Sequence, residues 1–174
     1  MRVIAGVHGG RRLTAPKGDA TRPTSDRVRE ALFSVLGDVT GLTVLDLFAG
    51  SGALGIEALS RGAASAVFVE RAAPALSALR ANLEILGLDA QVHRGDARTF
   101  ARNASEAGHT YDLVFLDPPY RDADRLGREL DLGSVIAAGG RLVTESDRRS
   151  PLAIDLPLTF ERRYGDTLIR IHGL

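Results

Sequence analysis

Residues 43–55 read TVLDLFAGSGALG, and this stretch decides the fold. The apolar run Thr43–Leu47 predicts a short buried strand, and Ala53–Arg61 predicts a helix. Gly50 and Gly52 lie between them, where the absence of side chains permits a tight turn and lets a ligand approach the backbone. The N–H groups at the start of the helix then face that ligand. The stretch therefore predicts a strand, a turn and a helix with a ligand at the turn.

Strands continue to alternate with helices along the rest of the chain. This alternation predicts an α/β fold with a parallel sheet that is covered by helices on both faces. The last two strands are joined by a turn too short for a parallel crossover, so at least one of them is antiparallel. The expected strands are Thr43–Leu47, Ala66–Val69, Ala90–His93, Tyr111–Leu116, Arg141–Thr144, Leu158–Arg163 and Thr167–Ile171, and the expected helices are Thr24–Leu36, Ala53–Arg61, Pro74–Leu86, Arg98–Ala107 and Asp124–Leu130.

The N-terminal 30 residues carry an excess of positive charge. They hold seven basic and three acidic side chains, a net charge of +4, whereas the remaining 144 residues carry −4. Arg2–Ile4 and Arg11–Thr14 predict a short hairpin around Gly9-Gly10. A basic segment on a mildly acidic body is typical of a polyanion contact, although a solvated surface hairpin has the same charge. We expect a basic arm over residues 1–22 and one domain over residues 23–174.

The composition is that of an ordinary globular protein, with 44% hydrophobic and 25% charged residues in a chain of 174. No apolar run approaches the ~20 residues that span a bilayer, and the N-terminus lacks the pattern of a signal peptide. The absence of cysteine excludes disulfides, and the four histidines lack the spacing of zinc ligands. We therefore expect a cytoplasmic protein without a metal and without a membrane contact.

The spacing Gly50-x-Gly52-x-x-Gly55 matches the fingerprint of dinucleotide-binding folds. Glu70 follows Gly50 by twenty residues, at the end of the second strand, where a carboxylate accepts hydrogen bonds from ribose hydroxyls. These features fit NAD or another adenosine cofactor. Asp46 separates the two, because its carboxylate would repel a pyrophosphate and suits a cofactor with an amino group and a sulfonium charge. Considered alone, Asp46 also fits a turn or capping residue.

A second acidic residue follows the third strand, in Gly95-Asp96-Ala97. The Asp96 carboxylate could accept a hydrogen bond from an adenine amine. Aspartate is equally favoured as the cap of a following helix, so both interpretations stay open here.

The sequence Asp117-Pro118-Pro119-Tyr120 directly follows the most apolar strand. The two prolines stiffen the backbone, so the Pro118 carbonyl points in a fixed direction. That carbonyl and the Asp117 carboxylate are two acceptors for the two hydrogens of an exocyclic amine, and the Tyr120 ring offers a face on which a base can stack. A rigid loop with a capping aspartate is the alternative, but the carboxyl end of a central strand is where open α/β sheets bind ligands.

These motifs, in this order, resemble those of S-adenosylmethionine-dependent amino-methyltransferases. Two longer stretches narrow the resemblance: residues 22–33, RPTSDRVREALF, and residues 46–62, DLFAGSGALGIEALSRG. They are similar to the bacterial 16S ribosomal RNA guanine-N2 methyltransferases, which modify the guanine conventionally called 966. The resemblance covers nearly the whole chain and is weakest over residues 121–159.

The resemblance implies a Rossmann-like class I methyltransferase fold, with a mostly parallel sheet of seven strands whose last strand is antiparallel. It implies that S-adenosylmethionine binds at Asp46, Phe48, Ala49, Gly50, Gly52, Glu70, Arg71, Asp96 and Ala97. The target amine would lie at Asp117, Pro118, Pro119 and Tyr120. We expect RNA contacts from Arg11, Arg12, Lys17, Arg22, Thr24 and Arg27, of which Thr24 and Arg27 lie beside either the methionine end of the cofactor or the target base.

The implied reaction is a direct, in-line transfer of a methyl group to the exocyclic N2 of guanine, with S-adenosylhomocysteine as the second product. We expect 16S ribosomal RNA within a small-subunit particle as the substrate, and a monomeric enzyme. Three alternatives stay open: a DNA adenine-N6 or cytosine-N4 methyltransferase, a protein-glutamine methyltransferase, and a non-catalytic cofactor-binding or RNA-binding module. A NAD-dependent dehydrogenase fits least, because no candidate proton donor lies near the site.

Overall fold

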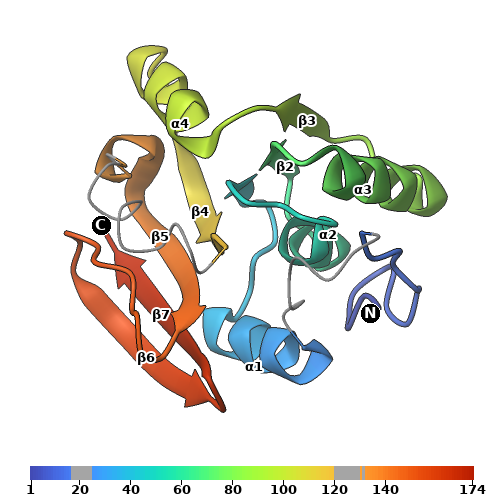
Figure 1. Cartoon of the computed structure of the whole chain (residues 1–174), viewed down its shortest axis with the longest axis horizontal. Helices are drawn as coiled ribbons and strands as arrows, with labels where there is room; N and C mark the ends of the chain where they lie inside the picture. The colour runs from blue at the N-terminus through green and yellow to red at the C-terminus, as the bar shows by residue number, and fades with distance from the viewer. Residues whose placement is uncertain (17–24, 120–129, 131) are drawn as a thin grey trace.

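The computed structural model describes residues 1–16, 25–119, 130 and 132–174, which fold around a seven-stranded sheet (Figure 1). The helices are α1 (Asp26–Leu36), α2 (Ala53–Ser60), α3 (Ala73–Leu86) and α4 (Ala97–Glu106), with a 3-10 turn η1 (Gly133–Val135). The strands are β1 (Thr43–Asp46), β2 (Ser65–Glu70), β3 (Gln91–Arg94), β4 (Tyr111–Leu116), β5 (Ile136–Asp147), β6 (Leu158–Tyr164) and β7 (Thr167–Gly173).

The strand order in the sheet is β3-β2-β1-β4-β5-β7-β6. The first five strands in this order are parallel to one another, whereas β7 is antiparallel to both β5 and β6. The prediction of a mostly parallel sheet with an antiparallel last strand is therefore confirmed. The strand order reverses at β1, since β2 and β4 lie on either side of it. Crevices at such reversals are where open α/β sheets bind their ligands.

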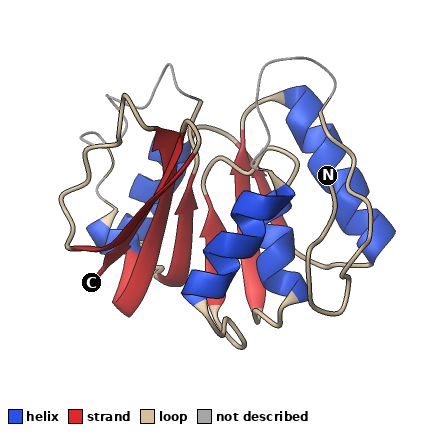
Figure 2. Ribbon diagram, turned by 90° about the horizontal axis from the view of Figure 1, so that it is seen from below, coloured by secondary structure: helices blue, strands red, loops and turns tan. Residues whose placement is uncertain are grey.

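Apolar side chains form one core on each face of the sheet. Successive strand residues point to opposite faces, so Val44 packs with α1, α2 and α3, whereas its neighbour Leu45 packs with α4. Figure 2 shows helices in front of and behind the strands. Both cores hold fully buried residues, such as Phe115 on one face and Val114 on the other. The strands are therefore fixed from both sides, and their carboxyl ends form a rigid rim.

Most predicted elements match the structure to within one or two residues at each end, and two differ by more. The predicted strand Arg141–Thr144 is the middle of the longer strand β5, which pairs with β4 on one side and β7 on the other. The predicted hairpin near the N-terminus has one bridge, Arg2 with Arg12, instead of two regular strands. Residues 124–129 of the predicted helix Asp124–Leu130 lie outside the described residues, as does the expected boundary between residues 22 and 23.

The N-terminal segment, residues 1–16, is docked on the domain. Val3 and Leu13 are buried in the same core as α1, α2 and α3. The buried Glu57 carboxylate on α2 accepts hydrogen bonds from the backbone N–H groups of Ile4, at 2.7 Å, and Ala5, at 3.0 Å. The basic residues of this segment are thus carried on a backbone that is held against α2. None of the helices in the described ranges is long and apolar enough to cross a membrane.

Candidate cofactor and acceptor site

The turn between β1 and α2 contains two glycines, Gly50 and Gly52, which have different structural roles. Gly50 and Gly52 both have positive φ angles, 55° and 85°, which side-chain-bearing residues rarely adopt. A Cβ atom on Gly52 would lie 2.4 Å from Leu79 Cδ1, so this glycine lets α3 pack against the turn. A Cβ atom on Gly50 would have no atom within 4 Å. The sequence predicted backbone open to a ligand at both glycines, and the structure places open space at Gly50.

Glu70 links the end of β2 to the glycine turn. One oxygen of its half-buried carboxylate accepts a hydrogen bond from the Gly50 N–H at 2.9 Å, and the other accepts one from the Ala72 N–H at 2.7 Å. An ionised carboxylate has about four acceptor positions, so these two bonds leave capacity for hydroxyl donors. Glu70 therefore orders the turn and presents acceptors at the same edge.

Asp46, the last residue of β1, is buried beneath this turn. Its carboxylate accepts a hydrogen bond from the Gly55 N–H at 3.2 Å, and its relative exposure is 2%. Burial, which leaves the charged form poorly solvated, and the nearby negative charge of Glu70 raise the pKa of Asp46 to about 7, although the hydrogen bond from Gly55 lowers it. Near neutral pH the group is thus divided between its acid and its carboxylate. A cation bound close to it would favour the carboxylate.

Asn82 is a positioning residue that the sequence did not reveal. It lies on the buried face of α3, and its amide donates to the Ser51 carbonyl at 2.9 Å and to the Thr14 carbonyl at 3.0 Å. Its side-chain oxygen accepts from the Thr14 N–H at 2.7 Å. Asn82 therefore ties the glycine turn to the N-terminal segment. The only signal in the sequence is a polar residue between the apolar positions Leu79 and Leu83, which are also buried.

Asp96 caps α4, as one of its two interpretations predicts. One carboxylate oxygen accepts from the N–H groups of Arg98, at 2.9 Å, and Thr99, at 3.3 Å. The next residue, Ala97, is the first residue of α4 and is buried. Asp96 follows β3, which pairs with β2 so that Arg94 lies beside Glu70. The two acidic residues thus follow neighbouring strands at the same edge.

The remaining predicted cofactor residues surround the start of the turn. Phe48 is half-buried and packs against the core on the α4 side, whereas Ala49 is buried and its N–H donates to the Val69 carbonyl at 3.1 Å. Arg71 is exposed just beyond β2. These residues therefore lie at the carboxyl ends of β1 and β2, beside Gly50 and Glu70.

The Asp-Pro-Pro sequence directly follows β4, and β4 lies next to β1, the strand that leads into the glycine turn. β1 and β4 pair in parallel with Asp46 beside Phe115, and the Leu47 N–H donates to the Phe115 carbonyl at 3.1 Å. Asp117 comes two residues after Phe115, directly after β4, and is half-buried, whereas Pro118 is buried and Pro119 is exposed. Neighbouring strands lie only about 4.8 Å apart. The turn and the Asp-Pro-Pro sequence therefore share one rim, and Tyr120 lies outside the described residues.

Three of the predicted RNA-binding residues are described, and all three are exposed: Arg11, Arg12 and Arg27. Arg11 also donates a hydrogen bond to the Ile85 carbonyl of α3 at 3.3 Å, which holds its side chain near the domain. The other three predicted residues lie outside the described part of the chain: Lys17, Arg22 and Thr24.

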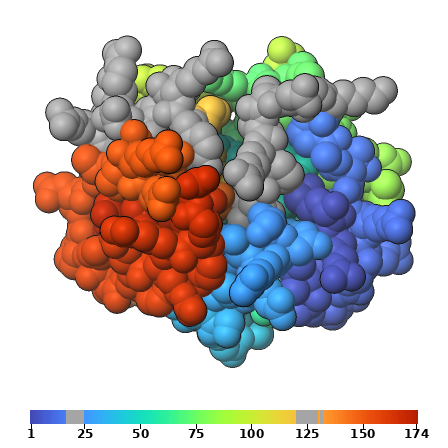
Figure 3. Space-filling view, turned by 60° about the horizontal axis from the view of Figure 1, so that its bottom comes forward, coloured from blue at the N-terminus to red at the C-terminus, as the bar shows by residue number. Residues whose placement is uncertain are grey.

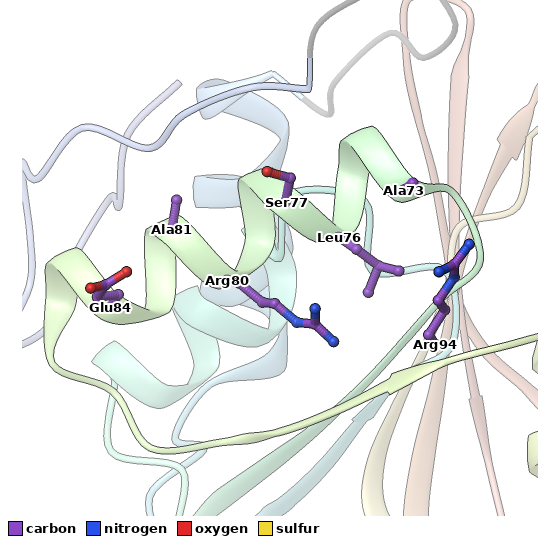
Figure 4. Close-up of a pocket in the computed structure, with 7 residues that line it drawn as sticks. All are labelled: Ala73, Leu76, Ser77, Arg80, Ala81, Glu84 and Arg94. Atoms are coloured by element: carbon purple, nitrogen blue, oxygen red, sulfur yellow. The ribbon is translucent and has the colours of Figure 1, made fainter.

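A separate hollow of about 390 Å³ lies between α3 and β3. Figure 4 shows the guanidinium groups of Arg80 and Arg94 on either side of Leu76. None of the predicted cofactor residues lines this hollow, so it is not the site at the glycine turn. Over the described ranges, no three histidine, aspartate or glutamate side chains form a group that could hold a metal ion.

Comparison with known proteins identifies the family. A family model described as conserved hypothetical protein 95 matches residues 1–172. The chain belongs to this family. YlbH of Bacillus subtilis, named as a candidate rRNA methyltransferase, is 41% identical over 180 residues, which cover 99% of this chain and 98% of YlbH. The similarity to this relative therefore extends over nearly the whole length of the chain.

Two further proteins connect the family to methyltransferases. The ribosomal RNA small subunit methyltransferase D of Escherichia coli K12 is 43% identical over 126 residues, which cover 70% of this chain but only 61% of the E. coli protein. The solved structure of E. coli yhhF, named as a candidate methyltransferase, matches 99% of this chain and 97% of its own with a TM-score of 0.84 and 34% identity. The Rossmann-like methyltransferase fold expected from the sequence is thereby confirmed.

Proposed function

We propose that this protein transfers a methyl group from S-adenosylmethionine to the exocyclic N2 of a guanine in 16S ribosomal RNA. One observation carries the proposal: the glycine turn with Glu70 and the Asp-Pro-Pro sequence lie at one rim, on neighbouring strands. The names of the relatives support methylation of ribosomal RNA. Guanine N2 and the position called 966 rest on the resemblance of residues 22–33 and 46–62.

The residues around the glycine turn fit the different parts of S-adenosylmethionine. Glu70 retains acceptor positions for the ribose hydroxyls, and the open space at Gly50 allows close approach to the backbone. Asp46 supplies negative charge below the turn, where it favours the amino and sulfonium groups. Phe48, Ala49, Arg71, Asp96 and Ala97 complete the proposed site at the neighbouring strand ends. When bound, S-adenosylmethionine supplies the activated methyl group.

The acceptor half of the site orients a weak nucleophile. The lone pair of the guanine N2 amine is delocalised into the ring. Hydrogen bonds from the two amine hydrogens to the Asp117 carboxylate and the Pro118 carbonyl would turn the nitrogen toward tetrahedral geometry and aim its lone pair at the methyl group. Orientation of this kind contributes up to roughly 7–11 kcal/mol when alignment is ideal. Asp117 acts here as an orienting acceptor, because the amine becomes strongly acidic only as the methyl group is transferred.

The direct test offers radiolabelled S-adenosylmethionine with unmodified 16S RNA, with small-subunit particles from an unmodified strain, and, for comparison, with DNA and with protein. Digestion to nucleosides should show N2-methylguanosine as the labelled product. Labelled N6-methyladenine or N4-methylcytosine in DNA, or label in protein, would refute the proposed substrate in favour of one of the alternative methyltransferases. No transfer to any of these substrates would favour a non-catalytic module.

The raised pKa of Asp46 predicts a pH-dependent affinity for the cofactor. A bound cation favours the ionised carboxylate, so below pH 7 binding must first remove a proton from Asp46. We expect the affinity for S-adenosylhomocysteine, measured by calorimetry, to rise about tenfold between pH 6 and pH 8 beyond the rise seen in Asp46→Asn. The amino group of the ligand titrates equally with the wild type and with Asp46→Asn, so comparing the two proteins removes its contribution. Identical pH profiles would show that Asp46 does not sense the ligand.

A further inference from the structure

A second hollow, of about 570 Å³, lies between the first turns of α1 and the turn that joins β6 to β7. Figure 3 shows the β6–β7 hairpin and α1 side by side on one face of the molecule, as does Figure 1. The hollow is lined by Ser25, Arg27, Val28, Ala31, Arg162, Arg163, Tyr164 and Gly165. These eight residues include three arginines and no acidic side chain.

The strand register places this hollow beside the part of the rim that holds Asp117 and Pro118. Leu116, the residue before Asp117, pairs with Thr144 of β5. β5 continues to Asp147, which pairs with Thr167 of β7, and Thr167 pairs with Tyr164 of β6. Three residues of strand span about 10 Å, so the tip of the hairpin stands roughly that far beyond the rim. The hairpin therefore forms a side wall of the acceptor half of the site.

Two arginines of the hollow differ from nearby arginines because they form no ion pair with a described acidic side chain. Arg148 pairs with Asp166, and Arg170 pairs with Glu161. By contrast, Arg27 and Arg162 are exposed and form no ion pair with any acidic side chain of the described residues. Two guanidinium groups that have no acidic partner among the described residues lie at one concave surface, and they create a positive potential that attracts anions.

The side chains of β6 alternate between its two faces. Arg162 pairs with Ile169, which packs in the core on the α1 side, so Arg162 faces α1 and Arg163 the opposite side. Tyr164 lies on the same face as Arg162, and the Arg162 guanidinium carbon lies 5.5 Å from the centre of its ring. This contact restrains the guanidinium toward the hollow.

We propose that this hollow binds the sugar–phosphate backbone of the RNA next to the target nucleotide, through Arg27 on α1 and Arg162 on β6. The inference rests on the proposed function, and it adds Arg162 on the last hairpin to Arg27, which the sequence already predicts to contact RNA. Guanidinium groups bind phosphates through paired N–H donors, and the positive end of the α1 dipole adds to their attraction. A strand held at this wall would direct a flipped base toward Asp117 and Pro118.

The test is the salt dependence of RNA binding, measured with a 16S RNA fragment in the presence of S-adenosylhomocysteine. Each lost phosphate contact reduces the slope of log affinity against log salt by about 0.7 to 0.9. We expect this reduction in Arg27→Ala and in Arg162→Ala, and about twice the reduction in the double variant. Arg102→Ala is the matched control, because Arg102 is an exposed arginine on α4, across the sheet.

Steady-state methylation separates binding from chemistry. In Arg162→Ala we expect the KM for RNA to rise about tenfold while kcat and the affinity for S-adenosylhomocysteine stay within about twofold of wild type. Unchanged salt slopes and KM, relative to Arg102→Ala, would overturn the inference. It would also be overturned if Arg162→Ala impaired methylation of the small-subunit particle alone, since that result indicates a protein contact. If wild-type protein binds RNA but methylates none, the proposed function fails, whereas the salt slopes still test the hollow.

Discussion

Asp117→Ala is expected to lower kcat for methyl transfer by at least about 100-fold, which corresponds to about 2.7 kcal/mol on the barrier. Asp117 follows β4 next to the glycine turn, and its carboxylate is one of the two acceptors proposed to orient the target amine. Its removal leaves one amine hydrogen without an acceptor, so the lone pair returns to the ring. The affinity for S-adenosylhomocysteine should change little, because the proposed cofactor contacts lie at β1, β2 and α4.

Two measurements make this expectation specific to Asp117. Single-turnover rates at saturating RNA report the chemical step, and calorimetry reports cofactor affinity. Asp155→Ala is a suitable control, because Asp155 is exposed in the loop between β5 and β6. If Asp117→Ala kept more than a tenth of the wild-type kcat, the carboxylate would not be the orienting acceptor. Loss of cofactor affinity in the same variant would assign Asp117 to the cofactor half of the site.

Glu57→Ala is expected to lower the free energy of unfolding by about 3–5 kcal/mol. Glu57 is fully buried, accepts a hydrogen bond from Arg61 Nε at 2.7 Å, and lies 3.9 Å from an Nη atom of Arg29, which is also fully buried. Its removal leaves the N–H groups of Ile4 and Ala5 without their acceptor and weakens the compensation of the Arg29 charge. Arg29 retains its ion pair with Asp26 at 2.7 Å, which limits the loss.

Loss of these hydrogen bonds is also expected to release the N-terminal segment, residues 1–16, from α2. Chemical denaturation measures the free energy of unfolding, and limited proteolysis with trypsin reports whether cleavage at Arg11 and Arg12 becomes faster. Glu30→Ala, on the exposed side of α1, is the control for loss of one carboxylate. A Glu57→Ala protein as stable as Glu30→Ala would show that the buried carboxylate does not hold the segment.

Local sequence signals predicted most of the elements, because these elements depend on short-range chemistry. Glycines at Gly50 and Gly52 permit the backbone angles of the turn, and Asp96 caps α4. The cap at Ser25 was not predicted, so the first helix was expected to begin at Thr24 instead of Asp26. The extent of β5 escaped prediction, because residues 137–140 read AAGG, which has little preference for a strand. In the structure these residues form an irregularity in the pairing with β4, between the pairs Tyr111–Ile136 and Leu113–Arg141, and Gly139 has a φ angle of 75°.

The order of strands and helices, the glycine turn and the antiparallel hairpin were determined by the sequence alone, since periodicity, backbone freedom and turn length act between residues that are close in the chain. Only the tertiary structure decided which charged side chains are buried and which lie close to one another. Burial beneath the turn sets the pKa of Asp46, and docking of the N-terminal segment gives Glu57 its partners. The placement of Arg27 and Arg162 at one hollow depends on the packing of α1 beside the last hairpin. Desolvation and charge proximity depend on distances in space, which a linear pattern does not contain.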